Sequence, residues 1–452
     1  MRAVAAALAL IALTPQTQPI APAEIVKLIE QELASVRVPG AAIAVVSGNQ
    51  TSATGYGMSD ARSKELVTPD TLMQVGSLTK LFTALAVTSS LHARELPLET
   101  PLGKLKPGLN TRAAAATFHE LLSHTSGLRD RQGDSGSDDE LALASDAREL
   151  PDAAFLFPAG LVFSYSNYGY ALAGAALESI IKKGFAEALR DAALAPLGME
   201  RSTMRRSEAE AKPHAVGHRL DGEATIAIAE PANDTRIWPA GYLWSTATDL
   251  SRVLAALIHQ GRVPDQPGLP RDVIEKVTTP HAPMPNVFAG GHYGYGLMIA
   301  RDRDVLIYEH GGTLPGFSAI LRVAPARQLG FAIIANLDNA PLRRVTQVVM
   351  GRALNLPEST PPVRQEVAVS ATEMKPLLGR YENRSTVDLT ARGDDVVFVV
   401  DDGPPLLVTR VGENRYVARP KPGAPGPEFV VQPGTGETPG YLHFALWAHR
   451  KR

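Results

Sequence analysis

The stretch Gly76-Ser77-Leu78-Thr79-Lys80-Leu81-Phe82-Thr83-Ala84-Leu85-Ala86-Val87 predicts a helix that is apolar nearly all round, and helices of that kind are buried. Lys80 is its one formal charge, and burying an unpaired ammonium is costly. Ser77 lies three residues earlier on the same helical face, so the two side chains can meet. A lysine removed from water loses its proton more easily and can accept one from the serine hydroxyl. The pattern therefore predicts a Ser-Lys nucleophile and a serine hydrolase.

The same short pattern occurs a second time in the chain, as Ser179-Ile180-Ile181-Lys182. That copy ends an Ala-rich helical run before Gly184, where a lysine is an ordinary cation at a helix C-terminus. Ser77 instead begins its helix, where backbone N–H groups can stabilise a developing oxyanion. The motif alone leaves two readings open, a nucleophile and a satisfied surface lysine.

Composition sets the class of protein. The 452 residues suffice for two or three domains with a large core. A hydrophobic content of 44% and a charged content of 20% are typical of a soluble globular protein. The formal charge of −2 gives a nucleic-acid partner no electrostatic support. The absence of cysteine excludes a disulfide framework, a thiolate zinc site and a cysteine nucleophile.

The first 23 residues read as an export signal. Met1-Arg2 supplies a short positive end, Ala3 to Leu13 an apolar stretch, and Ala21-Pro22-Ala23 a cleavage site of small residues. A buried N-terminal helix is the alternative, but Pro15 and Pro19 break the chain directly after the apolar part. We therefore expect a periplasmic or secreted protein, with no membrane span in the mature chain.

Strand patterns at both ends of residues 24–356 enclose a helix-rich middle. This order predicts one antiparallel sheet flanked by helices with an all-helical insertion, an α+β layout and not an alternating βαβ one. The expected helices are 24–37, the run from Ser77, the one opened by Thr246 and 342–354; the expected strands are 41–46, 51–57, 293–299, 305–309, 318–323 and 330–336.

A Pro-rich linker at 357–366 separates this part from a tail of different texture. Residues 367–452 contain short strand patterns between Gly, Asp, Asn and Pro turns, which predict a small all-β sandwich or barrel. A stiff linker also makes it a hypothesis that the tail caps a cleft or pairs subunits through a strand edge.

Two later segments add chemistry to the Ser-Lys pair. Tyr165-Ser166-Asn167 places a phenol and an amide in a loop before a helix. A tyrosine beside a cationic lysine can be driven toward phenolate and act as a general base, and the amide can orient a carbonyl or fix the lysine. His310-Gly311-Gly312-Thr313 ends a strand with two residues that lack side chains, so a substrate backbone can lie along the strand edge.

The three segments together resemble the signatures of the penicillin-recognising serine hydrolases, in the branch of class C β-lactamases, D-alanyl-D-alanine peptidases and esterases. Ser77-x-x-Lys80, Tyr165-x-Asn167 and His310-Gly311-Gly312 match its three motifs in order, and the likeness covers most of residues 24–356. The tail is similar, more weakly, to the lipocalin-like domains of some relatives.

This resemblance implies a role for each matching residue. Ser77 would form an acyl-enzyme, Lys80 and Tyr165 would share the proton transfers, and Asn167 would contact the substrate. The backbone N–H groups of Ser77 and Thr313 would form the oxyanion hole, with His310 and Gly312 lining the substrate site. Which of Lys80 and Tyr165 is the formal base stays open. No metal and no organic cofactor is implied.

One position departs from the family pattern. Gly311 stands where penicillin-binding members often have a Thr or Ser that binds the substrate carboxylate, and His310 replaces a permanently charged lysine. Losing such a hydroxyl costs on the order of 1–3 kcal/mol of binding. The sequence therefore favours a small-molecule or peptide ester or amide as substrate. The alternatives are a β-lactamase or D-alanyl-D-alanine carboxypeptidase and, from another class, a non-catalytic wall-ligand-binding protein. The oligomeric state is not indicated.

Overall fold

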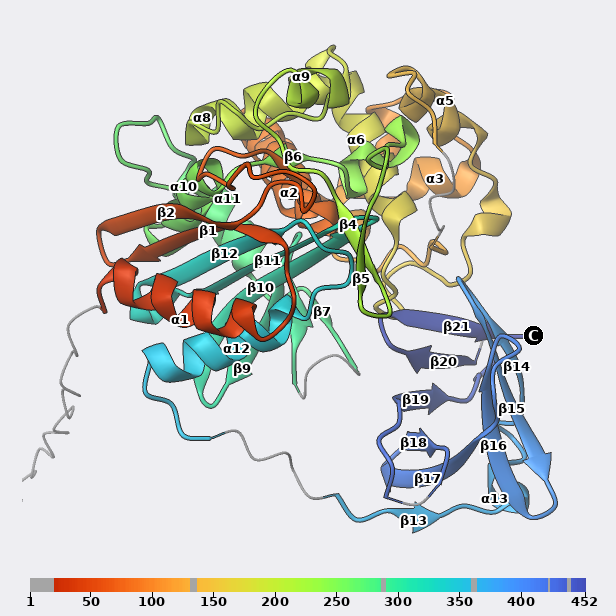
Figure 1. Cartoon of the computed structure of the whole chain (residues 1–452). Helices are drawn as coiled ribbons and strands as arrows, with labels where there is room; N and C mark the ends of the chain where they lie inside the picture. Colours follow the sequence, from red (N-terminus) through yellow and green to blue (C-terminus); the bar gives the residue numbers. More distant parts are fainter. Residues whose placement is uncertain (1–19, 131–135, 286–289, 359–363, 422, 437–439) are drawn as a thin grey trace, which may run out of the picture.

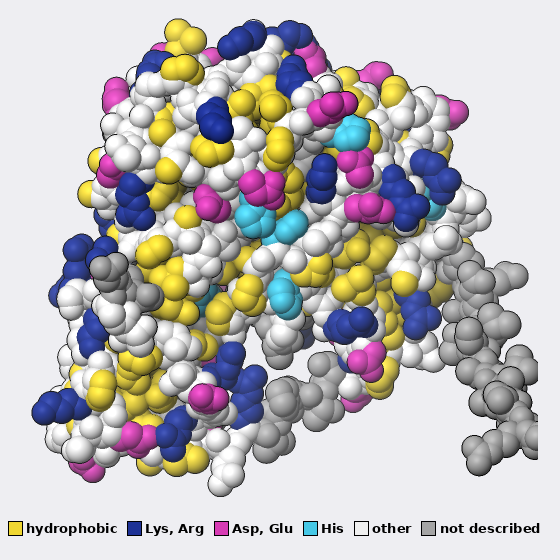
Figure 2. All heavy atoms as spheres, turned by 180° about the vertical axis from the view of Figure 1, so that it is seen from behind, with side chains coloured by type: hydrophobic (Ala, Val, Ile, Leu, Met, Phe, Trp, Pro, Cys, Tyr) yellow, Lys and Arg dark blue, Asp and Glu magenta, His cyan; other side chains and the backbone are white. Residues whose placement is uncertain are grey.

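The computed structural model describes residues 20–130, 136–285, 290–358, 364–421, 423–436 and 440–452. The apolar stretch of the expected export signal and the middle of the linker lie outside these ranges. No helix within them is long and apolar enough to cross a membrane. On the face shown in Figure 2, basic and acidic side chains are interspersed, in keeping with a net charge of −2.

An eight-stranded antiparallel sheet, built from both ends of the main domain, confirms the predicted α+β layout (Figure 1). Its spatial order is β2-β1-β12-β11-β10-β9-β8-β7. The register pairs Ile43 with Ile333 and Gly312 with Ala319, so the N-terminal hairpin and the C-terminal strands form one surface. The strands are β1 (Gly40–Ser47), β2 (Gln50–Gly57), β7 (Ala282–Pro283), β8 (His292–Tyr293), β9 (Met298–Asp302), β10 (Val305–Leu314), β11 (Phe317–Ala324) and β12 (Leu329–Ala335).

Both faces of this sheet are covered by helices, which explains why β1 is buried at every position. Because side chains alternate along a strand, Ile43 and Val45 pack with α1 (Pro22–Ala34) and α12 (Leu342–Ala353), whereas Ala44 and Val46 face the second core, on the side of α10 (Ala247–Ile258). Thr246 caps α10 by accepting a hydrogen bond from the Asp249 N–H, as the sequence predicts.

The insertion between β2 and β7 is mostly helical and holds the apolar helix α2. It differs from the all-helical expectation by two short ribbons, β3 with β6 and β4 with β5. Its elements are β3 (Met73–Gln74), α2 (Thr79–His92), α3 (Thr111–Ala115), α4 (Phe118–Leu122), α5 (Ala142–Glu149), α6 (Asn167–Ile181), α7 (Phe185–Leu189), α8 (Ala195–Leu197), α9 (Arg206–Glu210), β4 (His218–Asp221), β5 (Ala224–Ala227), β6 (Trp244–Ser245), α10 and α11 (Arg271–Thr278).

The expected single strand over 293–299 is wrong, because the chain folds back on itself between β8 and β9. Gly296 sits at the turn with φ +71°, a conformation that favours glycine. A Cβ there would lie 2.6 Å from the Cα of Leu81, so the turn presses directly on α2. The hydrophobic periodicity of residues 293–299 does not indicate this contact with a helix from a distant part of the chain.

The tail forms a closed antiparallel barrel of eight strands, β14 to β21, with β13 added beside β17. Closure comes from pairing between β17 and β18, and the buried rings of Phe398, Phe429 and Tyr416 stack in its core. Its elements are β13 (Val367–Ala368), α13 (Ala371–Met374), β14 (Gly379–Glu382), β15 (Thr386–Arg392), β16 (Asp395–Val400), β17 (Leu406–Gly412), β18 (Arg415–Arg419), β19 (Glu428–Gln432), β20 (Tyr441–Phe444) and β21 (Trp447–Lys451).

The barrel lies against the main domain, with β20 and β21 nearest to it in Figure 1. Buried hydrogen bonds cross this boundary. The Asn383 side-chain amide donates to Ser164 Oγ at 3.1 Å, and its Oδ1 accepts from the Asp130 N–H at 3.1 Å. The Ala448 N–H also donates to Ser164 Oγ, at 3.2 Å. Polar groups buried this way hold the two parts in one defined arrangement.

Candidate active site

Ser77 stands on a tight turn between β3 and α2, pressed against the end of β10. Gly76 has φ +53°, and a Cβ on it would lie 2.6 Å from the Thr313 backbone nitrogen. A Cβ on Gly312 would lie 1.9 Å from the Val75 carbonyl oxygen and 2.8 Å from the Ser77 nitrogen. Both glycines are therefore required for the close approach of the two backbones, which brings Ser77 beside Thr313.

Lys80 is fully buried beneath this turn, as the apolar helix predicts. Its Nζ lies 3.4 Å from Ser77 Oγ and donates to Asn167 Oδ1 and to the Ala240 carbonyl oxygen, both at 2.7 Å. Burial lowers the pKa of Lys80 from its ordinary value to about 7, against an opposing effect of the Asp130 charge. Near neutral pH a large share of this lysine is therefore the free amine.

The hydrogen bonds of Lys80 suit that neutral form. A neutral amine has two N–H groups, and the two short contacts, to Asn167 and Ala240, use both. The lone pair is then left for the third and longer contact, the one to the Ser77 hydroxyl. Lys80 is therefore placed to accept the serine proton.

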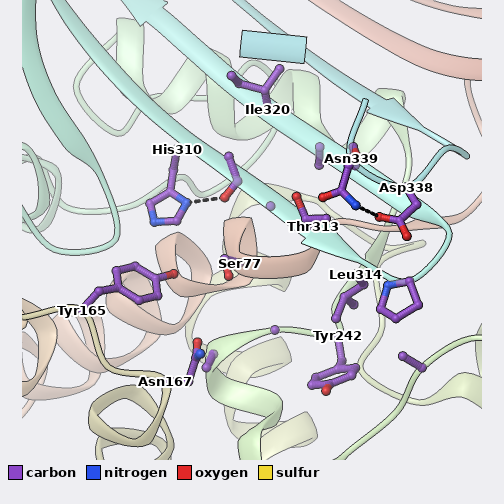
Figure 3. A pocket seen from close by; sticks show the side chains of 18 of the residues that line it. Ser77, Tyr165, Asn167, Tyr242, His310, Thr313, Leu314, Ile320, Asp338 and Asn339 are labelled. Carbon is purple, nitrogen blue, oxygen red and sulfur yellow. Dashed lines mark hydrogen bonds between the residues drawn. The ribbon is translucent and has the colours of Figure 1, made fainter. Parts of the chain in front are cut away.

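Tyr165 also meets Ser77, with its hydroxyl directed toward the serine in Figure 3. Burial raises the pKa of this phenol above its ordinary value, with hydrogen bonding to Ser77 opposing the shift. The expectation that the lysine drives Tyr165 toward phenolate is therefore wrong, although Lys80 Nζ lies 4.7 Å from the centroid of the Tyr165 ring. The spacing of the motifs indicates that Lys80 lies near Tyr165. It does not indicate that the phenol is fully buried, and burial favours the neutral phenol.

Asn167 begins α6 and is tied to Lys80 on one side and to Asp130 on the other. Its backbone N–H donates to Asp130 Oδ1 at 2.7 Å, and its amide nitrogen lies 3.4 Å from Asp130 Oδ2. Burial raises the pKa of Asp130, and the Asn167 hydrogen bond and the Lys80 charge oppose this. Asp130 was missed in the sequence, where a single acidic residue in a loop carries no recognisable spacing.

The edge of β10 forms the other wall of the site. β9 pairs with β10 only as far as Glu309, so residues 310–314 have β11 on one side and the pocket on the other. A Cβ on Gly311 would meet its nearest neighbour, the Ala319 oxygen, at 3.6 Å, which is ordinary contact. Unlike Gly312, position 311 therefore has room for a side chain.

His310 is a neutral residue of this wall. The Tyr293 hydroxyl lies 3.0 Å from its Nε2 and the Gly311 carbonyl oxygen 2.6 Å from its Nδ1. Burial, reinforced by the nearby Lys80 charge, lowers the pKa of His310 to about 3. The imidazole therefore does not replace the positive charge of the lysine that this position often carries in penicillin-binding relatives.

These residues line one cavity of about 870 Å³, seen from close by in Figure 3. Ser77, Tyr165, Asn167, His310, Gly312 and Thr313 all contribute to its wall, and Lys80 lies directly behind it. The structure thus brings together every site residue that the sequence predicts. In the described part of the chain, no cluster of three or more His, Asp or Glu side chains could hold a metal ion.

The barrel supplies a wall of the cavity, in keeping with the hypothesis that the tail caps a cleft, although the sequence does not indicate which of its residues do so. Leu446 and Trp447, at the turn between β20 and β21, line it together with Arg384 from the turn between β14 and β15. The Leu446 carbonyl oxygen accepts from the Tyr165 N–H at 2.9 Å, and Trp447 Nε1 donates to Asp130 Oδ2 at 3.1 Å. The tail is therefore in direct contact with the site.

The second Ser-x-x-Lys copy lies at the C-terminal end of α6, outside the cavity, as the sequence predicts. Ser179 donates to the Ala175 carbonyl oxygen of its own helix at 3.4 Å. Lys182 ends α6 in a left-handed conformation, with φ +63°.

An antiparallel sheet in an α+β fold that presses on a serine just before a buried helix, with a buried lysine behind that serine, defines a serine hydrolase of the β-lactamase type. The chain belongs to the beta-lactamase family, whose model, described as Beta-lactamase, matches residues 25–352.

The alignments with two curated relatives cover different shares of those proteins. Protein flp of Staphylococcus aureus (strain MW2) is 25% identical over 343 residues, 73% of this chain and 66% of that protein. The chain thus spans slightly less than two thirds of that relative. Penicillin-binding protein 4 of Amycolatopsis lactamdurans is 28% identical over 366 residues, 76% of this chain and 93% of that protein.

Among solved structures, the crystal structure of SurE is similar over both domains. It has a TM-score of 0.81 and 27% sequence identity, and the match covers 95% of this chain and 99% of SurE. SurE has also been solved with D-Leu, and that structure has a TM-score of 0.77 and 26% identity over the same shares. The likeness includes the C-terminal barrel, because residues 25–352 alone would cover less of the chain.

Proposed function

We propose that this protein hydrolyses ester or amide bonds through an acyl-enzyme on Ser77, with Lys80 as the base. The observation that carries this proposal is the buried Lys80 amine, 3.4 Å from Ser77 Oγ and with a pKa of about 7. A base whose pKa lies near the working pH is best suited to proton transfer.

Acylation follows from these positions. Lys80 takes the proton of the Ser77 hydroxyl while Oγ attacks the substrate carbonyl carbon. The oxyanion that forms is stabilised by the backbone N–H groups of Ser77 and Thr313, which the two glycine contacts bring side by side. Asn167 fixes Lys80 by accepting its hydrogen bond, and it lines the cavity in which the acyl group would lie.

Tyr165 acts in the second half of this step, when the tetrahedral intermediate collapses. A phenol with a raised pKa keeps its proton, and can pass it to the leaving group as the bond to the carbonyl carbon breaks. The proton held by Lys80 then restores that of Tyr165. In deacylation, water replaces the leaving group and the same two residues carry its proton to Ser77.

Esters and amides without a penicillin-like carboxylate contact at Gly311 are the proposed substrates. The missing hydroxyl at 311 and the neutral His310 both weaken that contact. A D-amino-acid peptide or a β-lactam is the second candidate, favoured by the relative named penicillin-binding protein 4 and by the SurE structure with D-Leu. We further propose export, with residues 1–23 as a signal peptide.

Intact mass after incubation with penicillin, together with release of nitrophenol from a neutral nitrophenyl ester, tests this proposal. We expect Ser77→Ala to abolish both turnover and any adduct, while its unfolding midpoint stays at the wild-type value. Ser179→Ala, in the second Ser-x-x-Lys copy, is the matched control and should leave both unchanged. Wild-type turnover in Ser77→Ala would refute the nucleophile.

A further inference from the structure

Arg384 of the barrel lines the catalytic cavity. Among the described residues it forms no close ion pair there. Its guanidinium carbon lies 4.9 Å from the centre of the Trp447 ring, and its nearest acidic atom is Asp130 Oδ2 at 3.9 Å from Nη1. The described residues give it no hydrogen bond within normal distance. Its side chain is 33% exposed, while that of Asp130 is 0% exposed.

Asp130 does not account for the position of this arginine. The two carboxylate oxygens already accept short hydrogen bonds from the Asn167 N–H, at 2.7 Å, and from Trp447 Nε1, at 3.1 Å. A distance of 3.9 Å is beyond hydrogen bonding. The guanidinium fork, five N–H donors that match a carboxylate in two parallel hydrogen bonds, therefore faces the cavity unused.

Arg343, on the other side of the cavity, is different. Its Nε lies 2.8 Å from an oxygen of Glu309, a carboxylate that also pairs with Arg322. The charge of Arg343 is thus balanced by a buried partner. Arg384 is stacked on an aromatic face instead, which fixes its plane without neutralising it.

The place of Arg384 relative to the chemistry follows from a chain of contacts. Trp447 lies edge-on to Tyr165, with ring centroids 6.4 Å apart, and Tyr165 meets Ser77. Arg384 lies beyond Trp447 in this order. A leaving group that extends from Ser77 past Tyr165, its proposed proton donor, would reach the wall of the cavity that Trp447 and Arg384 form.

We propose that Arg384 binds a carboxylate carried by the leaving group of the substrate. The chain thereby takes from its barrel the carboxylate contact that Gly311 and the neutral His310 no longer supply. The substrates are then esters or amides whose departing half is an acid, such as a peptide that loses a C-terminal residue. This inference rests on the proposed acyl-enzyme function and adds the substrate class to it.

A matched pair of esters tests this assignment. Phenylacetyl esters of 3-hydroxybenzoate and of 3-hydroxybenzamide share the acyl half and differ only by the charge of the leaving group. We expect Arg384→Gln to raise KM for the carboxylate ester about 10- to 100-fold, the range of a lost charge-assisted hydrogen bond, and to change KM for the neutral ester less than about twofold. Arg384→Lys should fall between, because it keeps the charge and loses the fork.

Arg380→Gln is the matched control, since Arg380 is a half-exposed arginine of the same barrel paired with Glu382 and Asp388. It should leave both KM values unchanged. An equal loss on the two esters, or no loss on the carboxylate ester, would overturn the role of Arg384. Failure of the proposed function looks different: wild-type turnover in Ser77→Ala, or no hydrolysis of either ester by the wild-type protein.

Discussion

The pH dependence of acylation follows directly from the burial of Lys80. A base with a pKa of about 7 is about half neutral at pH 7, about 9% neutral at pH 6 and about 1% neutral at pH 5. An ordinary lysine with the reference value of 10.5 would be only about 0.03% neutral at pH 7. Burial thus gives the site about 1,500-fold more free amine.

We therefore expect kcat/KM for a neutral nitrophenyl ester to rise about tenfold per pH unit below pH 6 and to level off above about pH 7.5. The sign follows from the lowered pKa, because the active form is the deprotonated amine and appears as the pH rises through 7. Lys80→Arg keeps its proton over this whole pH range. It should therefore lose the acidic limb of the profile, which is the rise of kcat/KM with pH, and its rate should fall about 10²–10⁴-fold.

Two variants separate Lys80 from its neighbours in this assay. Asp130→Asn removes a charge that raises the pKa of Lys80, so the limb should move to lower pH. His310→Asn should leave the limb where it is, because the histidine pKa is lowered to about 3. A limb centred near pH 10 would refute the lowered pKa of Lys80, and a limb that moves with His310→Asn would refute Lys80 as the base.

Four further predictions concern residues of the site and the boundary between the two domains. Gly311→Ser should fold normally, because its Cβ has room. It should raise the rate of penicillin adduct formation, followed by intact mass, about tenfold. Gly312→Ala should lower the free energy of unfolding by about 3 kcal/mol in urea titrations, since its Cβ would meet the Val75 oxygen at 1.9 Å. Tyr165→Phe should lower kcat for an amide substrate, whose leaving amine needs the proton, about 10²–10⁴-fold without changing the unfolding midpoint. Asn383→Ala removes the partner of the Asp130 N–H and Ser164 Oγ in the main domain and of the Ala448 carbonyl oxygen in the barrel. It should lower the free energy of unfolding by about 2 kcal/mol in the same titrations, and an unchanged midpoint would show that the domains do not depend on it.

The parts of the site that could be predicted are those set by local geometry. Ser77 and Lys80 meet because helix period puts residues three apart on one face, and the apolar residues around Lys80 already indicate its burial. The two hairpin strands follow from two strand-forming runs around the turn at 47–50, and α12 follows from helical spacing. The pKa of Tyr165 is not of this kind, because it depends on how completely distant segments exclude water.

The contacts made by the barrel could not be predicted, because they join positions hundreds of residues apart. Trp447 reaches Asp130 and Asn383 reaches Ser164 only after both domains have folded. Tyr381-Glu382-Asn383 repeats the Tyr-x-Asn spacing of the active site, but Asn383 does not line the cavity. Its amide instead spans the boundary between the domains.

These long-range contacts connect the barrel to the acidity of the lysine. The Lys80 pKa balances burial, which lowers it, against the Asp130 charge, which raises it. Asp130 is in turn held by a hydrogen bond from Trp447 and one to Asn383, both residues of the barrel. A small displacement of the barrel would therefore move a charge relative to Lys80, and one pKa unit is worth about 1.4 kcal/mol. The domain that holds Arg384 in the cavity thus also contacts the carboxylate whose charge raises the pKa of Lys80.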